Sequence, residues 1–175
     1  MRIIAGKLKG RQFNSPHGHR THPMSDKMRG ALFNTLGDIA GLTLLDAFAG
    51  SGAISFEAVS RGAATATAID RDPSAQKAIA DNIKILGVNR AVKLIKAPAA
   101  SWLTTTKDSF DIVVVDPPWD EPQPGLIARL SERTRQGGIF VTSLPKGLAI
   151  KLDERFELLQ QKDYGDGSLS FYRAL

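Results

Sequence analysis

The segment Asp116-Pro117-Pro118-Trp119 carries the side chains of this chain that are best suited to chemistry. It directly follows the apolar run Phe110–Val115, which predicts a buried strand. The two prolines lack N–H groups and have a fixed φ, so the loop after this strand is stiff and cannot continue a sheet. Asp116 and the Pro117 carbonyl can accept hydrogen bonds from an amino group, and Trp119 offers a flat face to a base. The segment therefore indicates a site that holds a planar ring by its exocyclic amine, unless it is only a proline-terminated strand with a core tryptophan.

A second candidate site is the strand-to-helix turn Asp46-Ala47-Phe48-Ala49-Gly50-Ser51-Gly52. Its glycines permit a tight turn and let backbone N–H groups approach a ligand. Asp70 ends the next predicted strand, where a carboxylate can bind both hydroxyls of a ribose. An NAD site needs a third glycine where this chain has Ser55, and Asp46 would repel a pyrophosphate. S-adenosylmethionine has no phosphate and carries cationic groups, so the pattern favours it over NAD and over a plain glycine turn.

The first 35 residues hold most of the excess positive charge of a chain whose net charge is +5. Asp26 is the only acid in this segment, which contains the basic residues Arg2, Lys7, Lys9, Arg11, Arg20, Lys27 and Arg29. A basic segment on a nearly neutral body favours a polyanionic partner, most simply RNA, over a merely solvated face. We expect the first five of these residues to bind RNA phosphates, with Lys27 and Arg29 nearer the active site or packed on the helix before the core.

Length and composition restrict the kind of protein further. A chain of 175 residues with 42% apolar residues suits one compact domain with a real core. It has no cysteine, which excludes disulfides and thiolate metal sites. The three histidines, His17, His19 and His22, fall in one segment that is more typical of a basic loop than of a metal site. With no membrane-spanning run and no secretory h-region, we expect a cytoplasmic, metal-free monomer.

Apolar periodicity and capping residues predict an α/β fold. Strands are expected at 42–46, 65–70, 92–95, 110–115, 139–143, 156–162 and 169–173, the last two antiparallel. Helices are expected at 26–36 after a Ser25 cap, 51–61, 73–86 and 124–135, with a hairpin at 2–13 and a loop at 14–23. This alternation predicts a Rossmann-like, mostly parallel, doubly wound sheet. We divide the single compact unit into an N-terminal basic hairpin and helix extension, 1–40, and a core, 41–175.

Taken together, these motifs resemble class I methyltransferases that act on amino nitrogens. Further segments resemble one family in that class, the bacterial guanine-N2 methyltransferases of small-subunit (16S) rRNA of the RsmD type: Met1–Lys7, Arg29–Asn34, Ser60–Ala63 and Tyr164–Asp166. The resemblance implies an acceptor site at Asp116, Pro117, Pro118 and Trp119 and a substrate that is 16S rRNA or a small-subunit ribonucleoprotein particle. It also implies S-adenosylmethionine as cofactor, bound by Asp46, Phe48, Gly50, Ser51, Gly52, Asp70, Arg71 and the backbone of Ala99.

The chain departs from that family's pattern at five positions. His22 and Met24 stand where the family usually has Arg and Thr, Pro98 where it has an Asp that contacts adenine, Trp119 where it has Tyr, and Asp70 where Glu is common. Two rival functions stay open. One is an adenine-N6 or glutamine-N5 methylase, although such enzymes typically have Asn in place of Asp116. The other is a non-catalytic rRNA-binding assembly factor that has kept the fold.

Overall fold

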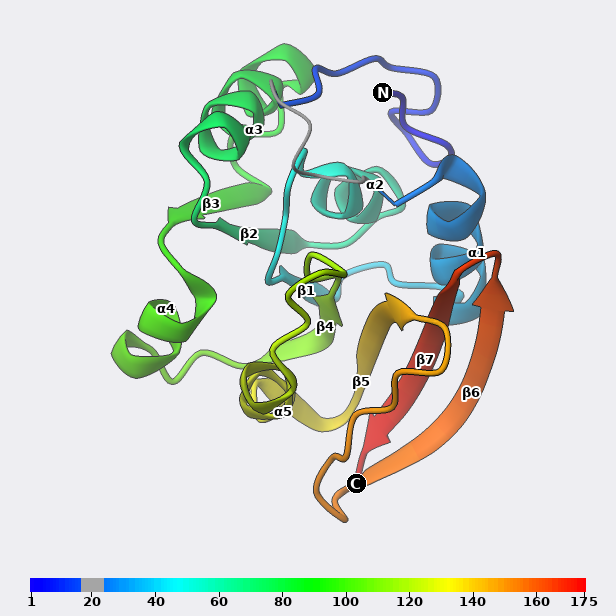
Figure 1. The fold of residues 1–175 in the computed structure, drawn as a ribbon. Helices are drawn as coiled ribbons and strands as arrows, with labels where there is room; N and C mark the ends of the chain where they lie inside the picture. The colour runs from blue at the N-terminus through cyan, green and yellow to red at the C-terminus, as the bar shows by residue number, and fades with distance from the viewer. Residues whose placement is uncertain (17–23) are drawn as a thin grey trace.

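The computed structural model describes residues 1–16 and 24–175 (Figure 1). In these residues the backbone forms a seven-stranded sheet of order β3-β2-β1-β4-β5-β7-β6. Its strands are β1 (Thr43–Asp46), β2 (Thr65–Asp70), β3 (Val92–Lys96), β4 (Phe110–Val115), β5 (Thr134–Pro145), β6 (Phe156–Tyr164) and β7 (Gly167–Ala174). The first five pair in parallel, and β7 lies antiparallel between β5 and β6. The Rossmann-like, mostly parallel sheet with an antiparallel C-terminal pair is therefore confirmed.

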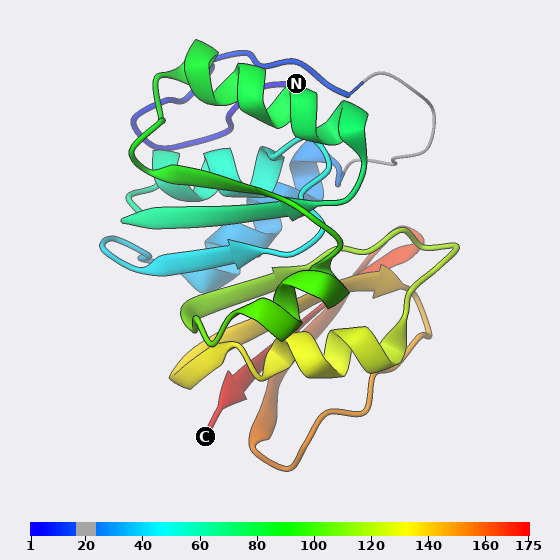
Figure 2. The same ribbon diagram turned by 90° about the vertical axis from the view of Figure 1, so that its left-hand side faces the viewer.

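Helices cover both faces of this sheet (Figure 2). They are α1 (Asp26–Leu36), α2 (Ala53–Ser60), α3 (Pro73–Leu86), α4 (Ala99–Thr105) and α5 (Pro124–Ser131). One apolar cluster packs α1, α2, α3 and the N-terminal segment on one face, and a second packs α4 and α5 on the other. The central strands are consequently buried on both sides, as their continuous apolar sequence predicts. None of the helices in the described ranges has the length and apolar character needed to cross a membrane.

The helix starts follow the capping residues. The hydroxyl of Ser25 accepts the Met28 N–H at the start of α1, and the carboxylate of Asp72 accepts the Ala75 N–H at the start of α3. Pro73 occupies the first turn of α3, where a missing N–H costs nothing. These caps confirm both predicted helix starts.

Several predicted boundaries were wrong. Helix α2 begins at Ala53 rather than at residue 51, because Gly52 adopts a left-handed conformation at its N-cap. Helix α5 ends at Ser131 rather than at residue 135, because β5 already begins at Thr134 beside β4. The unassigned stretch around Trp102 is helix α4, whose tryptophan packs on the apolar core.

The predicted hairpin at 2–13 is confirmed in part: Arg2 and Gln12 form an isolated antiparallel bridge, flanked by backbone hydrogen bonds between Phe13 and Met1 and between Ile3 and Arg11. The pairing is too short to form a named strand, and the N–H groups of Ile4 and Ala5 donate to the carboxylate of Glu57 on α2. Residues 1–40 also share the core of the rest of the chain, since their apolar side chains lie in the same cluster as α2 and α3. The boundary at residue 40 stays a prediction.

Candidate active site at the carboxyl edge of the sheet

Three carboxylates predicted from the sequence meet at one edge of the sheet. Asp46 ends β1, Asp70 ends β2, and Asp116 directly follows β4. Strands β2, β1 and β4 are neighbours and run parallel, so their carboxyl ends lie together, toward the right in Figure 2. This is the edge at which open α/β sheets bind ligands.

Asp46 is fully buried beneath the turn at 46–52, which we call the cofactor turn. Its Oδ2 accepts hydrogen bonds from the hydroxyl of Ser55 at 2.9 Å and from the Ser55 N–H at 3.2 Å. Its Oδ1 is buried and has no hydrogen-bond partner in the described part of the chain. Burial raises the pKa of Asp46 to about 7. The negative charge of Asp116 also raises this pKa, and the hydrogen bonds from Ser55 lower it. Such an oxygen favours a nearby cation, although a side chain with no exposed surface acts through its field rather than by direct contact.

The raised pKa of Asp46 predicts a pH-dependent stability that Asp46→Asn removes. The pKa of about 7 lies well above the ordinary pKa of an aspartate, 3.8. The native state therefore holds a proton that the unfolded chain loses, so stability falls as the pH rises from about 4 to about 7. Because one pKa unit corresponds to about 1.4 kcal/mol, we expect Asp46→Asn to be about 2–4 kcal/mol more stable than wild type at pH 8. Urea unfolding at pH 8 and pH 5 tests this, and a gain that does not shrink at pH 5 would contradict it.

Asp70 and Gly50 form the open side of the cofactor turn. The Gly50 N–H donates to Asp70 Oδ2 at 2.7 Å, and the Asp72 N–H donates to Asp70 Oδ1 at 2.8 Å. Burial raises the pKa of Asp70, and these backbone donors oppose the rise. A Cβ at Gly50 would meet no atom within 4 Å, whereas one at Gly52 would lie 2.6 Å from the Phe56 ring. The Phe56 ring thus fills the space beside Gly52, whereas the space beside Gly50, next to the half-buried carboxylate of Asp70, is free.

The predicted cofactor residues differ in exposure. Phe48, Gly50 and Asp70 are half-buried, and Arg71 is exposed. Ser51, Gly52 and Ala99 are buried within the turn and at the start of α4. A ligand at this edge would contact the half-buried and exposed residues directly, and the buried residues mainly through their backbone groups.

The acceptor loop, residues 116–123, lies at the same edge after β4. Burial raises the pKa of Asp116 to about 6, and a hydrogen bond with the Ser143 hydroxyl on β5 opposes the rise. Pro117 is buried and Pro118 exposed, and the Glu121 N–H donates to the Pro118 carbonyl at 3.0 Å, which closes a turn. Trp119 is 42% exposed, so it is not a core tryptophan and has a face available for stacking.

An exposed ion pair connects the two halves of the site. Arg71, directly after Asp70, places its Nη2 2.9 Å from Glu121 Oε2 in the acceptor loop. Both side chains are more than half exposed, so the pair contributes little to stability. It does bring the loop after β2 and the loop after β4 into contact across the cofactor turn.

Arg29 corrects one predicted RNA contact. Its side chain has no exposed surface. Its Nη2 donates to the Arg2 carbonyl at 2.8 Å and to the Asp26 carboxylate at 3.0 Å, and its Nε lies 3.8 Å from Glu57. Arg29 therefore ties the N-terminal segment to α1 and α2 and cannot reach RNA in this structure.

The exposed basic residues separate into two places, and Arg20 lies outside the described residues. The Lys7 N–H donates to the Ser60 carbonyl at the last residue of α2, and Arg11 donates to Ile85 near the end of α3. These helix ends lie at the amino edge of the sheet, opposite Asp116. Lys9 lies beside Lys7 in a turn that its N–H closes by donating to the Gly6 carbonyl. The exposed Lys27 lies in the first turn of α1, next to Met28 in the sequence. The terminal methyl of Met28 and the ring of Trp119 both lie close to Gly167. Only Lys27 of these four is brought near the acceptor loop.

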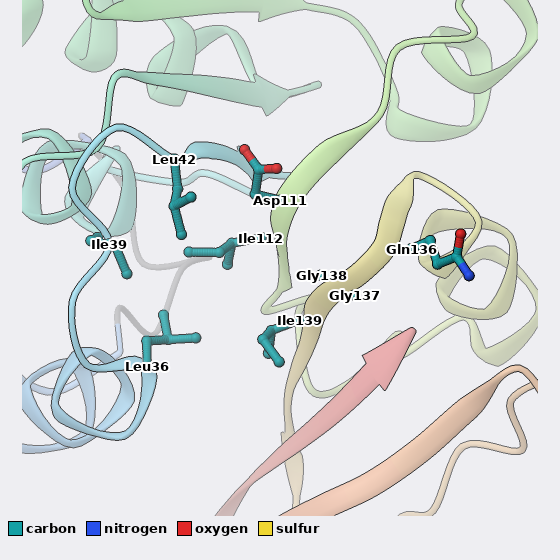
Figure 3. A pocket seen from close by; sticks show the side chains of 9 residues that line it. All are labelled: Leu36, Ile39, Leu42, Asp111, Ile112, Gln136, Gly137, Gly138 and Ile139. Carbon is teal, nitrogen blue, oxygen red and sulfur yellow. The ribbon is translucent and has the colours of Figure 1, made fainter. Parts of the chain in front are cut away.

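An apolar hollow of about 270 Å³ lies at the amino edge, away from the three carboxylates (Figure 3). Leu36, Ile39, Leu42, Ile112 and Ile139 line it, together with Asp111 and residues 136–138 of β5. Asp111 is already paired with Arg135 at 2.9 Å. The hollow offers no aromatic stacking face and no unpaired acid, so it is not the candidate active site. No group of metal-ligating side chains occurs in residues 1–16 and 24–175, and the three histidines lie outside these ranges.

Sequence reasoning missed two residues that contact the predicted acids. Ser143 hydrogen-bonds to Asp116 from β5, and no spacing in the sequence connects it to that acid. Ser55 was noticed only as a missing third glycine, yet its hydroxyl binds Asp46 nine residues earlier. A hydroxyl one helical turn after the glycine pair is a signal that could have found Ser55.

Comparison with known proteins agrees with this geometry. The family model described as "Conserved hypothetical protein 95" matches residues 1–173. Ribosomal RNA small subunit methyltransferase D of Escherichia coli is 38% identical over 120 residues, which make up 68% of this chain and 60% of that protein. The putative rRNA methyltransferase YlbH of Bacillus subtilis is 34% identical over 69% of this chain and 68% of its own length. Both alignments leave about a third of this chain unmatched, and the first leaves 40% of the Escherichia coli protein unmatched.

The solved structure titled "Putative methyltransferase yhhF from Escherichia coli" superposes with a TM-score of 0.88 at 28% identity. It covers 99% of this chain and 97% of that one, so the whole fold is shared. The family model, the relatives and the fold agree, and the chain belongs to this family, the RsmD-type methyltransferases that its motifs resemble.

Proposed function

We propose that this chain is an S-adenosylmethionine-dependent methyltransferase that methylates the exocyclic N2 amine of a guanine in small-subunit rRNA. The observation that carries the proposal is the convergence of Asp46, Asp70 and Asp116 beside the acceptor loop with its exposed Trp119. The printed names of the relatives, which are small-subunit or putative rRNA methyltransferases, support the same substrate class. An rRNA substrate would keep the protein in the cytoplasm, and we retain the expectation of a monomer.

The residues around the cofactor turn fit this cofactor. The unpartnered Oδ1 of Asp46 suits a ligand that carries positive charge. The open space at Gly50 lies beside Asp70, whose carboxylate can accept hydrogen bonds from two ribose hydroxyls. When bound, S-adenosylmethionine supplies an electrophilic methyl group. Phe48 and Arg71 would border it on the exposed side.

Asp116 would orient the acceptor amine. The lone pair of the guanine N2 amine is delocalised into the ring, so the amine is a weak nucleophile. Hydrogen bonds from it to the Asp116 carboxylate and to the Pro117 carbonyl would fix its direction. With a pKa of about 6, Asp116 is mostly ionised at pH 7 to 8, so its carboxylate acts as an acceptor for the amine. Trp119 would stack on the base, which must leave its own stack to reach the pocket.

The type of side chain at position 116 favours guanine over adenine. The Watson–Crick edge of guanine presents two adjacent donors, the N1–H and the N2 amine. An ionised carboxylate only accepts hydrogen bonds, so it matches two donors. The same edge of adenine presents a donor and an acceptor, which an amide side chain matches better. Asp116 thus supports a guanine acceptor.

Asp70→Ala is expected to weaken binding of S-adenosylmethionine by about 1–3 kcal/mol, because the ribose hydroxyls lose their partner. Isothermal titration calorimetry checks this, with Asp81→Ala, an exposed acid on α3, as the matched control. Equal affinity of Asp70→Ala and wild type would remove Asp70 from the site. A wild type that binds RNA but not the cofactor would favour the assembly-factor alternative.

Replacing Lys7, Lys9 and Arg11 together by alanine is expected to weaken RNA binding and to lower its log–log salt slope by up to ~2–3, because bound phosphates release counterions. Cofactor affinity should not change, since these residues lie at the other edge of the sheet. RNA binding across a salt series decides it. The control pair is Lys107→Ala with Lys151→Ala, exposed lysines beside the α4 and α5 face. An unchanged slope in the triple variant would mean that the RNA lies elsewhere.

A further inference from the structure

We propose that Gly167, together with Met28, is a positioning residue for Trp119 and so sets where the acceptor base stacks; the inference rests on the proposed function. Gly167 is the buried first residue of β7. A Cβ at this position would lie 2.8 Å from Cη2 and Cζ2 of Trp119 and 3.3 Å from Cε of Met28. The six-membered ring of the indole therefore lies directly against the glycine, in space that any other side chain would fill.

This contact joins three separate segments at the carboxyl edge. Trp119 comes from the acceptor loop, Gly167 from the start of β7, and Met28 from the first turn of α1. In Figure 2 the acceptor loop and the start of β7 lie at the same end of the molecule. Because Met28 is buried and its thioether end is soft, it can fill the space beside the ring. The indole is thereby supported from one side while 42% of it stays exposed.

The support under the ring is rigid. Gly167 pairs with Pro145 of β5 on one side and with Tyr164 of β6 on the other. Next to it, the Lys146 N–H donates to the Asp166 carbonyl at 2.8 Å. The glycine is held in the sheet and cannot move away from an added methyl group. The indole, at the end of a stiff but exposed loop, is the group that must shift.

A shifted indole would misplace the base relative to Asp116. The stacking plane of the base is set by Trp119, and the amine position by Asp116, three residues apart in one stiff loop. A displacement of about 1 Å at a reacting centre can cost about 100-fold in rate. The missing side chain at position 167 is therefore part of the acceptor site, although Gly167 itself touches no substrate.

Gly167→Ala tests this cleanly, because its φ lies outside the left-handed region and alanine adds no backbone strain. We expect kcat/KM for RNA to fall at least about 10-fold with unchanged cofactor affinity. The matched control is Gly125→Ala, at a helical glycine whose Cβ would meet no atom within 4 Å. In a Trp119→Phe background, where Cη2 and Cζ2 are gone, Gly167→Ala should change kcat/KM less than about 2-fold.

A second readout does not depend on activity. With Trp102→Phe, Trp119 is the only tryptophan of the chain, and its quenching by acrylamide reports its exposure. Gly167→Ala should increase this quenching, and Gly125→Ala should not. Unchanged quenching, or an equal loss of kcat/KM with and without the indole, would overturn the positioning role alone. A wild type that methylates no RNA would instead refute the proposed function, and the positioning role with it.

Discussion

Asp116→Ala is expected to abolish methyl transfer to RNA while leaving the affinity for S-adenosylmethionine nearly unchanged. Asp116 is assigned to the acceptor amine, and its removal leaves that amine without its charged hydrogen-bond partner. We expect a loss of at least about 100-fold in the single-turnover rate, measured with a tritiated methyl donor. The fold should persist, because burial already raises the pKa of Asp116 to about 6 and the protein gains little from its charge.

Two further variants serve as controls for Asp116→Ala. Asp120→Ala removes an exposed acid from the same acceptor loop and should keep near-normal turnover. Asp116→Asn keeps one acceptor oxygen at the same place and should fall between wild type and Asp116→Ala. Near-normal turnover of Asp116→Ala would show that the amine is oriented by another group.

Glu57→Ala is expected to destabilise the protein by about 3–5 kcal/mol, a large part of the ~5–15 kcal/mol that holds a typical domain folded. Glu57 is fully buried on α2. Its carboxylate accepts the N–H groups of Ile4 at 2.8 Å and Ala5 at 3.0 Å and the Nε of Arg61 at 2.8 Å, and lies 3.8 Å from the buried Arg29. Its removal leaves the two backbone donors and the Nε of Arg61 without their acceptor, and takes one of the two nearby carboxylates from the buried Arg29, which keeps Asp26.

Urea unfolding of Glu57→Ala measures the cost, and hydrogen exchange at Ile4 and Ala5 shows whether the N-terminal segment has come loose. Glu154→Ala, at an exposed acid, should change stability by less than about 0.5 kcal/mol. Glu57→Gln keeps the acceptor shape and should cost less than Glu57→Ala. Protected amides at positions 4 and 5 in Glu57→Ala would contradict the view that this carboxylate attaches the segment.

The sequence predicted the fold because its signals are local. Strand β4 carries the apolar run Ile112–Val115 and is followed by Asp116 and two prolines, and α3 is marked by Asp72, Pro73 and the glycine after it. The carboxyl ends of β1, β2 and β4 could be placed together without coordinates, since parallel strands in βαβ units share one edge.

The errors arose where long-range contacts replace local rules. The hairpin at 2–13 is paired over only a short stretch, and a buried carboxylate 53 residues after Ile4, which no local rule predicts, binds the N–H groups of Ile4 and Ala5. Arg29 reads as a surface cation, yet α1 turns it inward onto Asp26 and Glu57. The contact of Trp119 with Gly167 joins segments that are 48 residues apart and has no local pattern.

Nucleoside mass spectrometry of rRNA tests the central proposal most directly. Small-subunit rRNA from cells that contain the gene should hold N2-methylguanosine that disappears when the gene is deleted. Wild-type protein should restore it, and Asp116→Ala, expressed at the same level, should not. Unchanged N2-methylguanosine after deletion, or loss of a different methylated nucleoside such as N6-methyladenosine, would contradict the account.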